Sequence, residues 1–400
     1  MPMSGIYVRD ELDALAGSVD IRLIAPLPNL QWFGEMHREK FQVSSLKFQV
    51  SGFRFQTAIR HPELVPGSSY TAEYTVVRPF VLAFPRWFLQ RLYPASMAFS
   101  LRLSGSFLGE CDCLHVHTAF PDVVAAELAF GEKTPIVATV HGSDLNYFAM
   151  KPSLQPGIVA ALNRCTRIIC VSSSLERTAR ELGVRAETTV IPNGIDTSVF
   201  RPGGKEEACT RLNLDPARPR VLYAGNFVPV KGVEYLIRAM PHVLGRCPEC
   251  ELVLVGASPG MARRTPYDSL IAGVGIGASV RVVERVERVE LPAWIQASDV
   301  VAVPSVREGF GLIAAESLAC GRPVVSTRSG GPEDIVEERQ GLLVPPGDPE
   351  AFGAAMLTVL DGRGIHEPDI LARSAVRRFS YESVARRILG VYEEASGKSI

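Results

Sequence analysis

Residues 304–321 read PSVREGFGLIAAESLACG, and they follow an apolar run at residues 300–303. The apolar run predicts a buried strand, and Gly309 and Gly311 allow the backbone after it to approach a ligand closely. A helix is expected from Gly311 to the residue before Gly321. Backbone amides at the start of such a helix suit an anionic group, for example a diphosphate.

Two carboxylates flank this helix start, with Glu308 in the loop and Glu316 inside the helix. Sugar hydroxyls favour such acceptors and phosphates favour the amide donors, so the layout suits a sugar nucleotide. The spacing alone fits equally well a Glu308 that caps the helix and a Glu316 that faces solvent.

A second loop follows the apolar run at residues 221–224 and reads GNFVPVKG from Gly225 to Gly232. Lys231 would begin a helix at the carboxyl end of that strand, where its charge can neutralise a leaving diphosphate. The alternative is a solvated loop lysine. The loop is no P-loop, because the pattern G-x4-G-K-[ST] is absent.

A third loop, from Thr139 to Asp144, reads TVHGSD at the end of another expected strand. Ligands bind at the carboxyl ends of parallel strands, so we expect His141 and Asp144 to face the cleft from the other domain. A lone histidine is usually structural, but one followed by glycine at this place is a better site candidate.

Metal binding is not indicated. We expect His115 and His117, which lie on one predicted strand, to point to opposite faces, and this argues against a shared metal ion. No Asp-x-Asp pair occurs in the chain, so the usual paired-aspartate site for a divalent cation and a nucleotide is missing. Cys247 and Cys250 form a lone C-x2-C pair, which we interpret as a turn between a helix and a strand.

Short apolar runs alternate with amphipathic helical patterns, which predicts βαβ units on parallel sheets. One series of expected strands comprises residues 20–25, 113–117, 136–140, 168–171 and 188–191. The second series comprises residues 220–224, 251–255, 280–283, 300–303, 323–326 and 341–344. The break between them, at residues 200–219, is rich in proline and glycine. We therefore expect two doubly wound domains that face each other across a cleft.

Composition excludes several classes of protein. The chain has 400 residues, 46% of them hydrophobic, and 42 basic against 43 acidic residues give a net charge of −1. This balance excludes a strong overall attraction to nucleic acid. Eight cysteines without a signal-peptide pattern indicate a reduced, cytoplasmic setting. No run is long enough for a membrane span.

Two segments depart from the βαβ rhythm. Phe41-Gln-Val-Ser44 recurs as Phe48-Gln-Val-Ser51, which we interpret as a tandem insertion at residues 40–56 in a surface loop. Residues 77–109 contain no acidic residue and mix arginines with aromatic side chains. One hypothesis is peripheral contact with the inner membrane surface through residues 78–102. The other is a helix pair packed on the first sheet, with solvated arginines.

These pieces together resemble glycosyltransferase family 4, the retaining transferases of the GT-B fold. The matching segments, in chain order, are residues 5–10, 141–144, 171–173, 191–196, 225–232, 297–299, 308–316 and 330–333. The resemblance implies two Rossmann-like domains, an acceptor-side domain at residues 1–200 and a nucleotide-sugar-binding domain at residues 201–378. A last helix at residues 379–396 would return to the first domain.

The resemblance also implies roles for single residues. Lys231 resembles the lysine that binds the donor diphosphate, Glu308 the glutamate that contacts the donor sugar, and Glu316 the glutamate that accepts bonds from the ribose. His141 resembles a cleft histidine near the transferred sugar and the acceptor, so Lys231, Glu308 and His141 are the expected catalytic residues. Asp144 is assigned with His141 to the acceptor side.

The remaining donor contacts are expected at Asn226 and at the loop of Gly309, Phe310, Gly311 and Leu312, whose amides would hold phosphate. The family implies a nucleotide-diphosphate sugar as donor, with no cofactor and no metal ion required. The acceptor would be a glycan, a lipid-linked sugar or a small molecule.

Two departures from the family stand out. The family usually has an arginine where this chain has Asn226, and we expect Arg307 or Arg328 to replace it. A lost charged hydrogen bond costs about 1.5–3 kcal/mol. The chain also starts inside the loop that normally follows the first strand, so we expect the first domain to lack its N-terminal strand.

Other functions stay open. A sugar-nucleotide epimerase or hydrolase on the same fold would need further acid and base groups in the cleft. An inactive, truncated fragment could still bind nucleotide through its second domain. A dinucleotide-dependent dehydrogenase is disfavoured, because no G-x-G-x-x-G follows an early strand.

Overall fold

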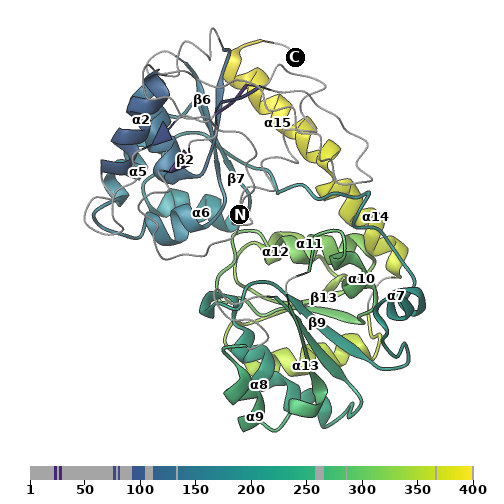
Figure 1. The fold of residues 1–400 in the computed structure, drawn as a ribbon. Helices are drawn as coiled ribbons and strands as arrows, with labels where there is room; N and C mark the ends of the chain where they lie inside the picture. The colour runs from purple at the N-terminus through teal and green to yellow at the C-terminus, as the bar shows by residue number, and fades with distance from the viewer. Residues whose placement is uncertain are drawn as a thin grey trace, which may run out of the picture.

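The computed structural model describes residues 22–24, 27–28, 75–77, 80–81, 92–103, 111–131, 134–256, 265–284, 286–364 and 367–398. It forms two lobes, each built around a parallel sheet, and a long helix at the chain's C-terminal end lies along the first lobe (Figure 1). The expected tandem insertion at residues 40–56 and the expected loss of a first strand before residue 22 lie outside the described residues.

The second domain is built on a six-stranded parallel sheet in the order β11-β10-β9-β12-β13-β14. The strands are β9 (Arg220–Ala224), β10 (Glu251–Val255), β11 (Val280–Val283), β12 (Val300–Val303), β13 (Val324–Thr327) and β14 (Gly341–Val344). Their runs of valine and leucine suit a sheet that is covered on both faces. The strands expected from the sequence are confirmed, with β13 displaced by one residue.

Helices cover both faces of this sheet (Figure 1). Helices α8 (Val233–Leu244) and α13 (Pro349–Leu360) pack on one face, together with α9 (Asp268–Gly273). The other face carries α11 (Leu312–Ala319) and α14 (Pro368–Phe379), with the shorter α10 (Leu291–Gln296) and α12 (Pro332–Ile335) beside them. Helix α7 (Lys205–Leu212) packs on α10 at the edge of the domain.

The order of the strands reverses between β9 and β12. From β9 the chain proceeds outward through β10 to β11, and from β12 it proceeds outward the other way through β13 to β14. The loops after β9 and β12 are therefore drawn apart at their far ends, and a ligand crevice is expected between them. These two loops hold Lys231 and Glu308.

The first domain has a four-stranded parallel sheet in the order β5-β6-β7-β8. The strands are β5 (Leu114–His117), β6 (Ile136–Val140), β7 (Arg167–Cys170) and β8 (Thr188–Val190). Two short parallel pairs come from the region before it: β1 (Arg22–Ile24) with β3 (Thr75–Val77), and β2 (Leu27–Pro28) with β4 (Phe80–Val81). The helices described before β8 are α2 (Tyr93–Leu103), α4 (Val124–Phe130), α5 (Gln155–Leu162) and α6 (Ser173–Glu181). Two short turns, η3 (Ala119–Val123) and η4 (Asp144–Phe148), accompany them, and the backbone of Phe120 in η3 leaves the helical region.

The helix expected at residues 379–396 begins later than the sequence suggested. Phe379 ends α14, and α15 runs from Tyr381 to Ser396. Ser380 separates the two helices, because its backbone leaves the helical region and its side chain caps α15 by accepting from the Ser383 amide at 3.2 Å. Helix α15 packs on the first sheet, as the family resemblance implies, through Val384, Ile388 and Val391.

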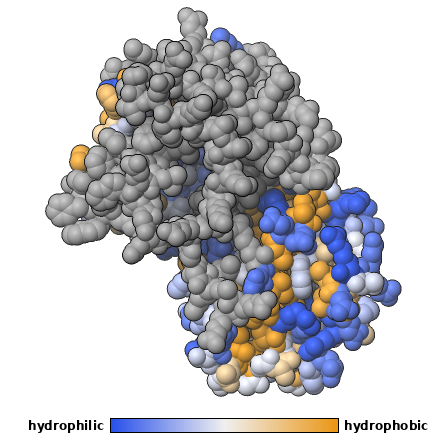
Figure 2. All heavy atoms as spheres, viewed as in Figure 1, coloured by the Kyte–Doolittle hydropathy of each residue, from blue (hydrophilic) through white to orange (hydrophobic). Residues whose placement is uncertain are grey.

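The structure describes part of the segment at residues 78–102 that was proposed to contact a membrane. Helix α2 buries Met97, Ala98 and Leu101 against Ala125 of α4, and Arg102 donates to the Leu128 carbonyl. Phe99 and Leu103 of α2 are exposed, as is Leu92 just before this helix. Over the visible face of the second domain, apolar residues lie in narrow strips between polar ones (Figure 2). Among the described residues, no helix has both the length and the apolar character needed to cross a membrane.

A buried ion pair anchors the first strand of the second domain. The Arg220 guanidinium donates to Glu251 at 2.9 Å, and the two side chains are 1% and 4% exposed. Arg281 donates to the other oxygen of Glu251 at 2.9 Å. Arg220 also donates to the Asp215 carbonyl at 2.7 Å, so β9, β10 and β11 share one charged network at their amino ends.

We predict that Glu251→Ala destabilises the second domain by about 3–5 kcal/mol, because it leaves the buried Arg220 without a counter-charge. The measurement is urea unfolding followed by circular dichroism. The matched control is Glu249→Ala, because the side chain of Glu249 is exposed. A loss below about 1 kcal/mol for Glu251→Ala would show that the network contributes no more than a surface pair.

Candidate active site

The loops after β9 and β12 meet through an ion pair. Lys231 Nζ lies 2.6 Å from Glu308 Oε2, and the same oxygen accepts a hydrogen bond from Ser305 Oγ at 3.0 Å. The Lys231 side chain is 31% exposed and that of Glu308 is 14% exposed. The pair is thus half-buried but open to a ligand, which matches the place that the sequence assigned to a donor diphosphate and sugar.

The backbones of the two loops touch directly. Gly232 has φ 62°, and a Cβ there would lie 2.0 Å from the Pro304 carbonyl oxygen. Only glycine fits such a site, because it has neither the clash nor the strain of a left-handed side chain. The Val306 amide donates to the Val230 carbonyl at 2.9 Å and continues this contact. Lys231 is therefore held beside Glu308 by main-chain packing.

The loop of Glu308 is anchored on its other side as well. The Glu308 amide donates to the Ser329 carbonyl at 2.9 Å, and its carbonyl accepts from the Gly331 amide at 3.0 Å. Phe310 is buried, with its ring edge-on to Phe379 at 5.9 Å between centroids. Its side chain points inward, which leaves the backbone of this loop to line the crevice.

Helix α11 begins at Leu312, after Gly311 at φ 100°. Among the described residues no side-chain cap is found at this helix start, where backbone amides are suited to an anionic ligand. Glu308 is accordingly not the helix cap that its spacing also allowed.

Glu316 is buried, at 4% exposure, and does not face solvent. Arg288 Nη2 lies 3.1 Å from Glu316 Oε1, and the Arg288 guanidinium also lies over the Phe200 ring at 5.1 Å. Sequence reasoning missed Arg288. It stands in a run of alternating charged residues before α10, and nothing in that pattern separates it from its neighbours.

Asn226 has an exposed side chain. Its backbone carbonyl accepts a hydrogen bond from Tyr223 Oη at 2.8 Å, which shapes the turn after β9. Burial raises the pKa of Tyr223, and the nearby Tyr267 and Glu308 raise it further, so this phenol remains a donor. Of the two arginines expected to replace the family's arginine, Arg307 donates to the Asn146 carbonyl at 3.2 Å and Arg328 is exposed. That replacement stays a prediction.

His141 and Asp144 follow β6, in the first domain. Asp144 is 1% exposed, and its carboxylate accepts from the amides of Ala119 at 3.0 Å and Gly142 at 2.8 Å. It also accepts from the amides of His141 and Leu145. The acceptor-side assignment of Asp144 stays a prediction, and this geometry supports a role in holding the loop of His141 rather than contact with the acceptor.

One expectation about this region is wrong. His115 and His117 do not point to opposite faces of β5, because their ring centroids lie 4.4 Å apart. Residues two apart on a strand share a face, so the neighbouring rings follow from strand geometry. His117 continues the cluster to His141, with Nδ1 3.0 Å from His141 Nε2. Even so, no group of three or more metal-ligating side chains with the geometry for a metal ion is found among the described residues.

The two domains meet at these loops. A Cβ on Gly309 would lie 2.3 Å from the His141 carbonyl oxygen, and one on Gly142 would lie 3.0 Å from the Gly309 Cα. Asp334 accepts from the Ser173 amide at 2.6 Å. The structure thus places the main chain of His141 against the loop of Glu308. A cleft shared by the two domains stays a prediction.

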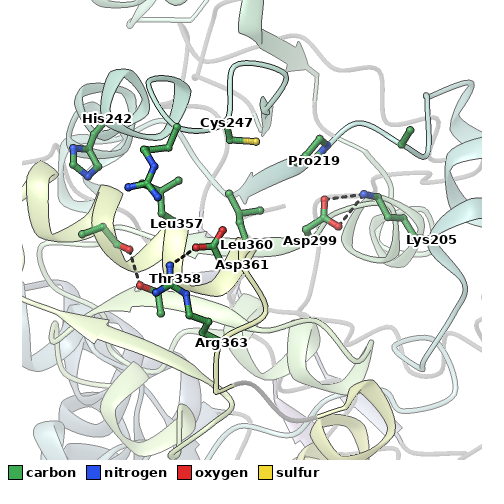
Figure 3. A pocket seen from close by; sticks show the side chains of 13 residues that line it. Lys205, Pro219, His242, Cys247, Asp299, Leu357, Thr358, Leu360, Asp361 and Arg363 are labelled. Atoms are coloured by element: carbon green, nitrogen blue, oxygen red, sulfur yellow. Dashed lines mark hydrogen bonds and ion pairs between the residues drawn. The ribbon is translucent and has the colours of Figure 1, made fainter.

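A cavity of about 520 Å³ lies at the other edge of the second sheet, before β9 and β12 begin. Figure 3 shows His242, Cys247 and Arg363 among the residues that line it, with Lys205 paired to Asp299. Helices α8 and α13 both end here, and cations beside helix C-termini are favourable. The basic residues are explained by these helix ends, and the cavity is remote from Lys231.

The Cys247–Cys250 segment is a turn, as expected. It lies between α8 and β10, and the Cys250 amide donates to the Cys247 carbonyl at 3.0 Å. Burial and the neighbouring Cys247 raise the pKa of Cys250 to about 12, so its thiol stays protonated and is a poor metal ligand.

Solved structures show the same two-domain arrangement. Sucrose-phosphate synthase from Thermosynechococcus elongatus aligns with a TM-score of 0.72 at 23% identity, over 98% of this chain and 93% of that one. HepE from Anabaena, in complex with UDP and glucose, aligns with a TM-score of 0.65 at 22% identity, over 79% and 86% of the two chains. The architecture is the GT-B fold.

Family patterns cover both domains. Residues 47–199 match the family described as Glycosyltransferase Family 4, and residues 218–362 match the one described as Glycosyl transferases group 1. Over these two ranges the chain is similar to both glycosyltransferase families. Similar curated proteins include D-inositol 3-phosphate glycosyltransferases from Nocardioides sp., 36% identical over 222 residues, and from Xylanimonas cellulosilytica, 36% identical over 217 residues. Each match covers 52% of this chain. The chain spans about half the length of these relatives, 48% of the first and 51% of the second.

We predict that Gly309→Ala slows the turnover of a UDP sugar on the order of 100-fold, well beyond its effect on nucleotide affinity, because the new methyl group pushes His141 away from the loop of Glu308. The measurement compares UDP affinity by calorimetry with the turnover of a UDP-sugar. Gly273→Ala is the control, since nothing lies within 4 Å of a Cβ there. Equal turnover for Gly309→Ala and the native chain would show that this contact is dispensable.

Proposed function

We propose that this protein is a retaining glycosyltransferase that moves a sugar from a nucleotide-diphosphate sugar to an acceptor. The observation that carries the proposal is the Lys231–Glu308 pair, at 2.6 Å, at the point where the strand order of the second sheet reverses. A cation, a carboxylate and an uncapped helix start converge there, and the loop of His141 faces them from the first domain.

In this proposal, departure of the diphosphate leaves an oxocarbenium-like sugar. Lys231 and the first amides of α11 stabilise the negative charge that develops on the diphosphate. Glu308 accepts hydrogen bonds from the sugar hydroxyls, and His141 helps to place the acceptor. Because Lys231 already touches Glu308, the same ammonium group can orient the carboxylate and meet the phosphate.

Retention is taken from the resemblance to glycosyltransferase family 4, and the described carboxylates bear on how it is achieved. Glu308 is engaged by Lys231 and Ser305, Glu316 is paired with Arg288, and Asp144 is held by four backbone amides. None of these carboxylates is placed for covalent attack on the sugar. Front-face attack, with the leaving diphosphate as the base that takes the acceptor proton, fits these residues better.

The donor is proposed to be a uridine diphosphate sugar. Structural neighbours of the same fold include HepE with UDP and glucose and an Escherichia coli protein with UDP-2-fluoro glucose. The acceptor is proposed to be a glycan, a lipid-linked sugar or a small polyol phosphate. The last is suggested by the similar D-inositol 3-phosphate glycosyltransferases. No cofactor and no metal ion take part in the proposed reaction.

Peripheral membrane contact through residues 78–102 belongs to the same proposal, with a cytoplasmic place at the inner membrane surface. Its support is the exposed Phe99 and Leu103 of α2, with the exposed Leu92 just before this helix. Of the arginines in this segment the structure describes Arg102, which donates to the Leu128 carbonyl.

We predict that Lys231→Ala weakens the binding of a UDP sugar roughly 10- to 100-fold, the effect of losing a charged hydrogen bond of about 1.5–3 kcal/mol. Calorimetric titration with UDP, GDP and ADP sugars measures the change and identifies the base. Lys205→Ala is the matched control, because this lysine pairs with Asp299 at the opposite edge of the same sheet. No binding of any of these sugars by the folded native chain would contradict the proposal.

We predict that Asn226→Arg strengthens donor binding by about tenfold, because an exposed side chain beside Lys231 gains a second cation for the diphosphate. The same titration measures it, and Asn226→Gln separates the effect of length from that of charge. If Arg307 or Arg328 already supplies the missing donor, Asn226→Arg will leave the affinity unchanged.

A further inference from the structure

Two histidines beside the proposed site have no role in the reaction described so far. His115 and His117 lie on β5, whose carboxyl end is next to that of β6, the strand that leads to His141. Their rings are in contact with each other, and the His117 ring stacks on that of His141 at 5.3 Å and 19°. The three imidazoles form one row from the interior of the first domain toward the cleft.

The contact between His117 and His141 constrains which of their ring nitrogens carry a proton. His117 Nδ1 and His141 Nε2 are 3.0 Å apart, which is a hydrogen-bond distance. Two neutral imidazoles can make this bond only if one of these nitrogens carries a proton and the other does not. Burial lowers the pKa of both rings, and the neighbouring His115 and His141 lower that of His117 further, so both are neutral at pH 7.

The other nitrogen of His141, Nδ1, is buried and has no hydrogen-bond partner of good geometry among the described residues. The charge of Asp144 and an interaction with the Asn193 side chain favour the charged ring. Since a neutral imidazole carries one proton, the state of Nε2 fixes that of Nδ1. If Nε2 accepts from His117, Nδ1 carries the proton, and if Nε2 donates, Nδ1 carries none.

His117 is itself held in place from behind. His115 Nδ1 lies 2.6 Å from Tyr392 Oη, and its Nε2 lies 2.7 Å from Thr139 Oγ1. Both ring nitrogens of His115 are thus engaged, one of them by α15 and the other by β6. The His115 ring, fixed by these two contacts, packs against the His117 ring with 4.4 Å between the ring centroids. Tyr392 therefore extends the row of contacts to the helix that closes the chain.

We propose that His117 is a positioning residue for His141, which fixes the orientation and the tautomer of the His141 ring, with His115 and Tyr392 as its support. The effect on sugar transfer rests on the proposed function, whereas the tautomer of His141 does not. A shared metal ion does not explain the arrangement of the three imidazoles. Both nitrogens of His115 are within hydrogen-bond distance of hydroxyl groups, and the rings of His117 and His141 bond directly to each other.

The first test is nitrogen NMR of the histidine rings in the chelator-treated full chain without ligand. His141→Asn identifies the His141 signals by their loss. We expect one protonated and one unprotonated nitrogen for His141 in the native chain. In His117→Leu the Nε2 partner is gone, and we expect averaged signals from two exchanging tautomers. His117→Asn can place an amide near the position of Nδ1, and we expect it to restore the single tautomer.

The second test separates positioning from folding. We expect His117→Leu to lower kcat for a UDP sugar by roughly tenfold or more, a fraction of what a placed acid–base group contributes, with little change in KM for the donor. His117→Asn should recover most of this loss. His242→Leu is the control, because this histidine lies at the remote edge of the second sheet. Urea unfolding of each variant shows whether the fold is retained.

The outcomes are distinct. A single, unchanged tautomer of His141 in His117→Leu would overturn the proposal, whatever the activity. Equal loss of kcat in His117→Leu and His117→Asn, with equal loss of stability, would assign His117 to packing alone and would also overturn it. If the native chain turns over no donor but the tautomer responds as expected, the proposed function fails and the positioning of His141 stands.

Discussion

Parallel pairing of β9 with β12 is the constraint on which the rest of the site depends. The two strands are neighbours in the sheet although they are far apart in the chain, and Val300 and Val301 pair with Val221 and Leu222. Their following loops must then share one crevice, and the close approach of Gly232 to Pro304 fixes the distance between them. Without that pairing, Lys231 and Glu308 would have no reason to meet. The charges of the pair already balance each other, so any anionic ligand bound there would share Lys231 with Glu308.

Backbone contact, more than side-chain contact, joins the two halves of the site. Gly142 and Gly309 allow main chains from different domains to touch, and Gly330 lies beside Ser174 in the same seam. Side chains of the acceptor side are fixed within their own domain instead, as the four amides around Asp144 show. The glycines thus bring loops of the two domains into direct main-chain contact.

The sequence predicted the second domain well for a physical reason. Strands β9, β10 and β12 consist mostly of apolar residues. Such apolar runs are easily recognised as strands in a sequence when the sheet is buried on both faces. The sequence predicted that Lys231 and Glu308 lie near the same ligand, but it did not predict that they form an ion pair. The Arg288–Glu316 pair could not be predicted, because its partners come from separate elements and charged residues carry no periodicity there. The error over His115 and His117 came from misjudging strand geometry, and the break at Ser380 from a cap that breaks a continuous helical pattern.

The connection between the domains has a mechanical consequence. The chain crosses from the first domain to the second near Ile195 and returns near Ser380, and the two crossings lie side by side: the Ile195 amide donates to the Phe379 carbonyl at 2.7 Å, and Gly194 packs on the Tyr381 ring. A single linker would let the lobes twist about any axis. Two crossings that are bonded to each other bend more easily than they twist. Any relative movement of the two lobes must therefore bend both crossings together.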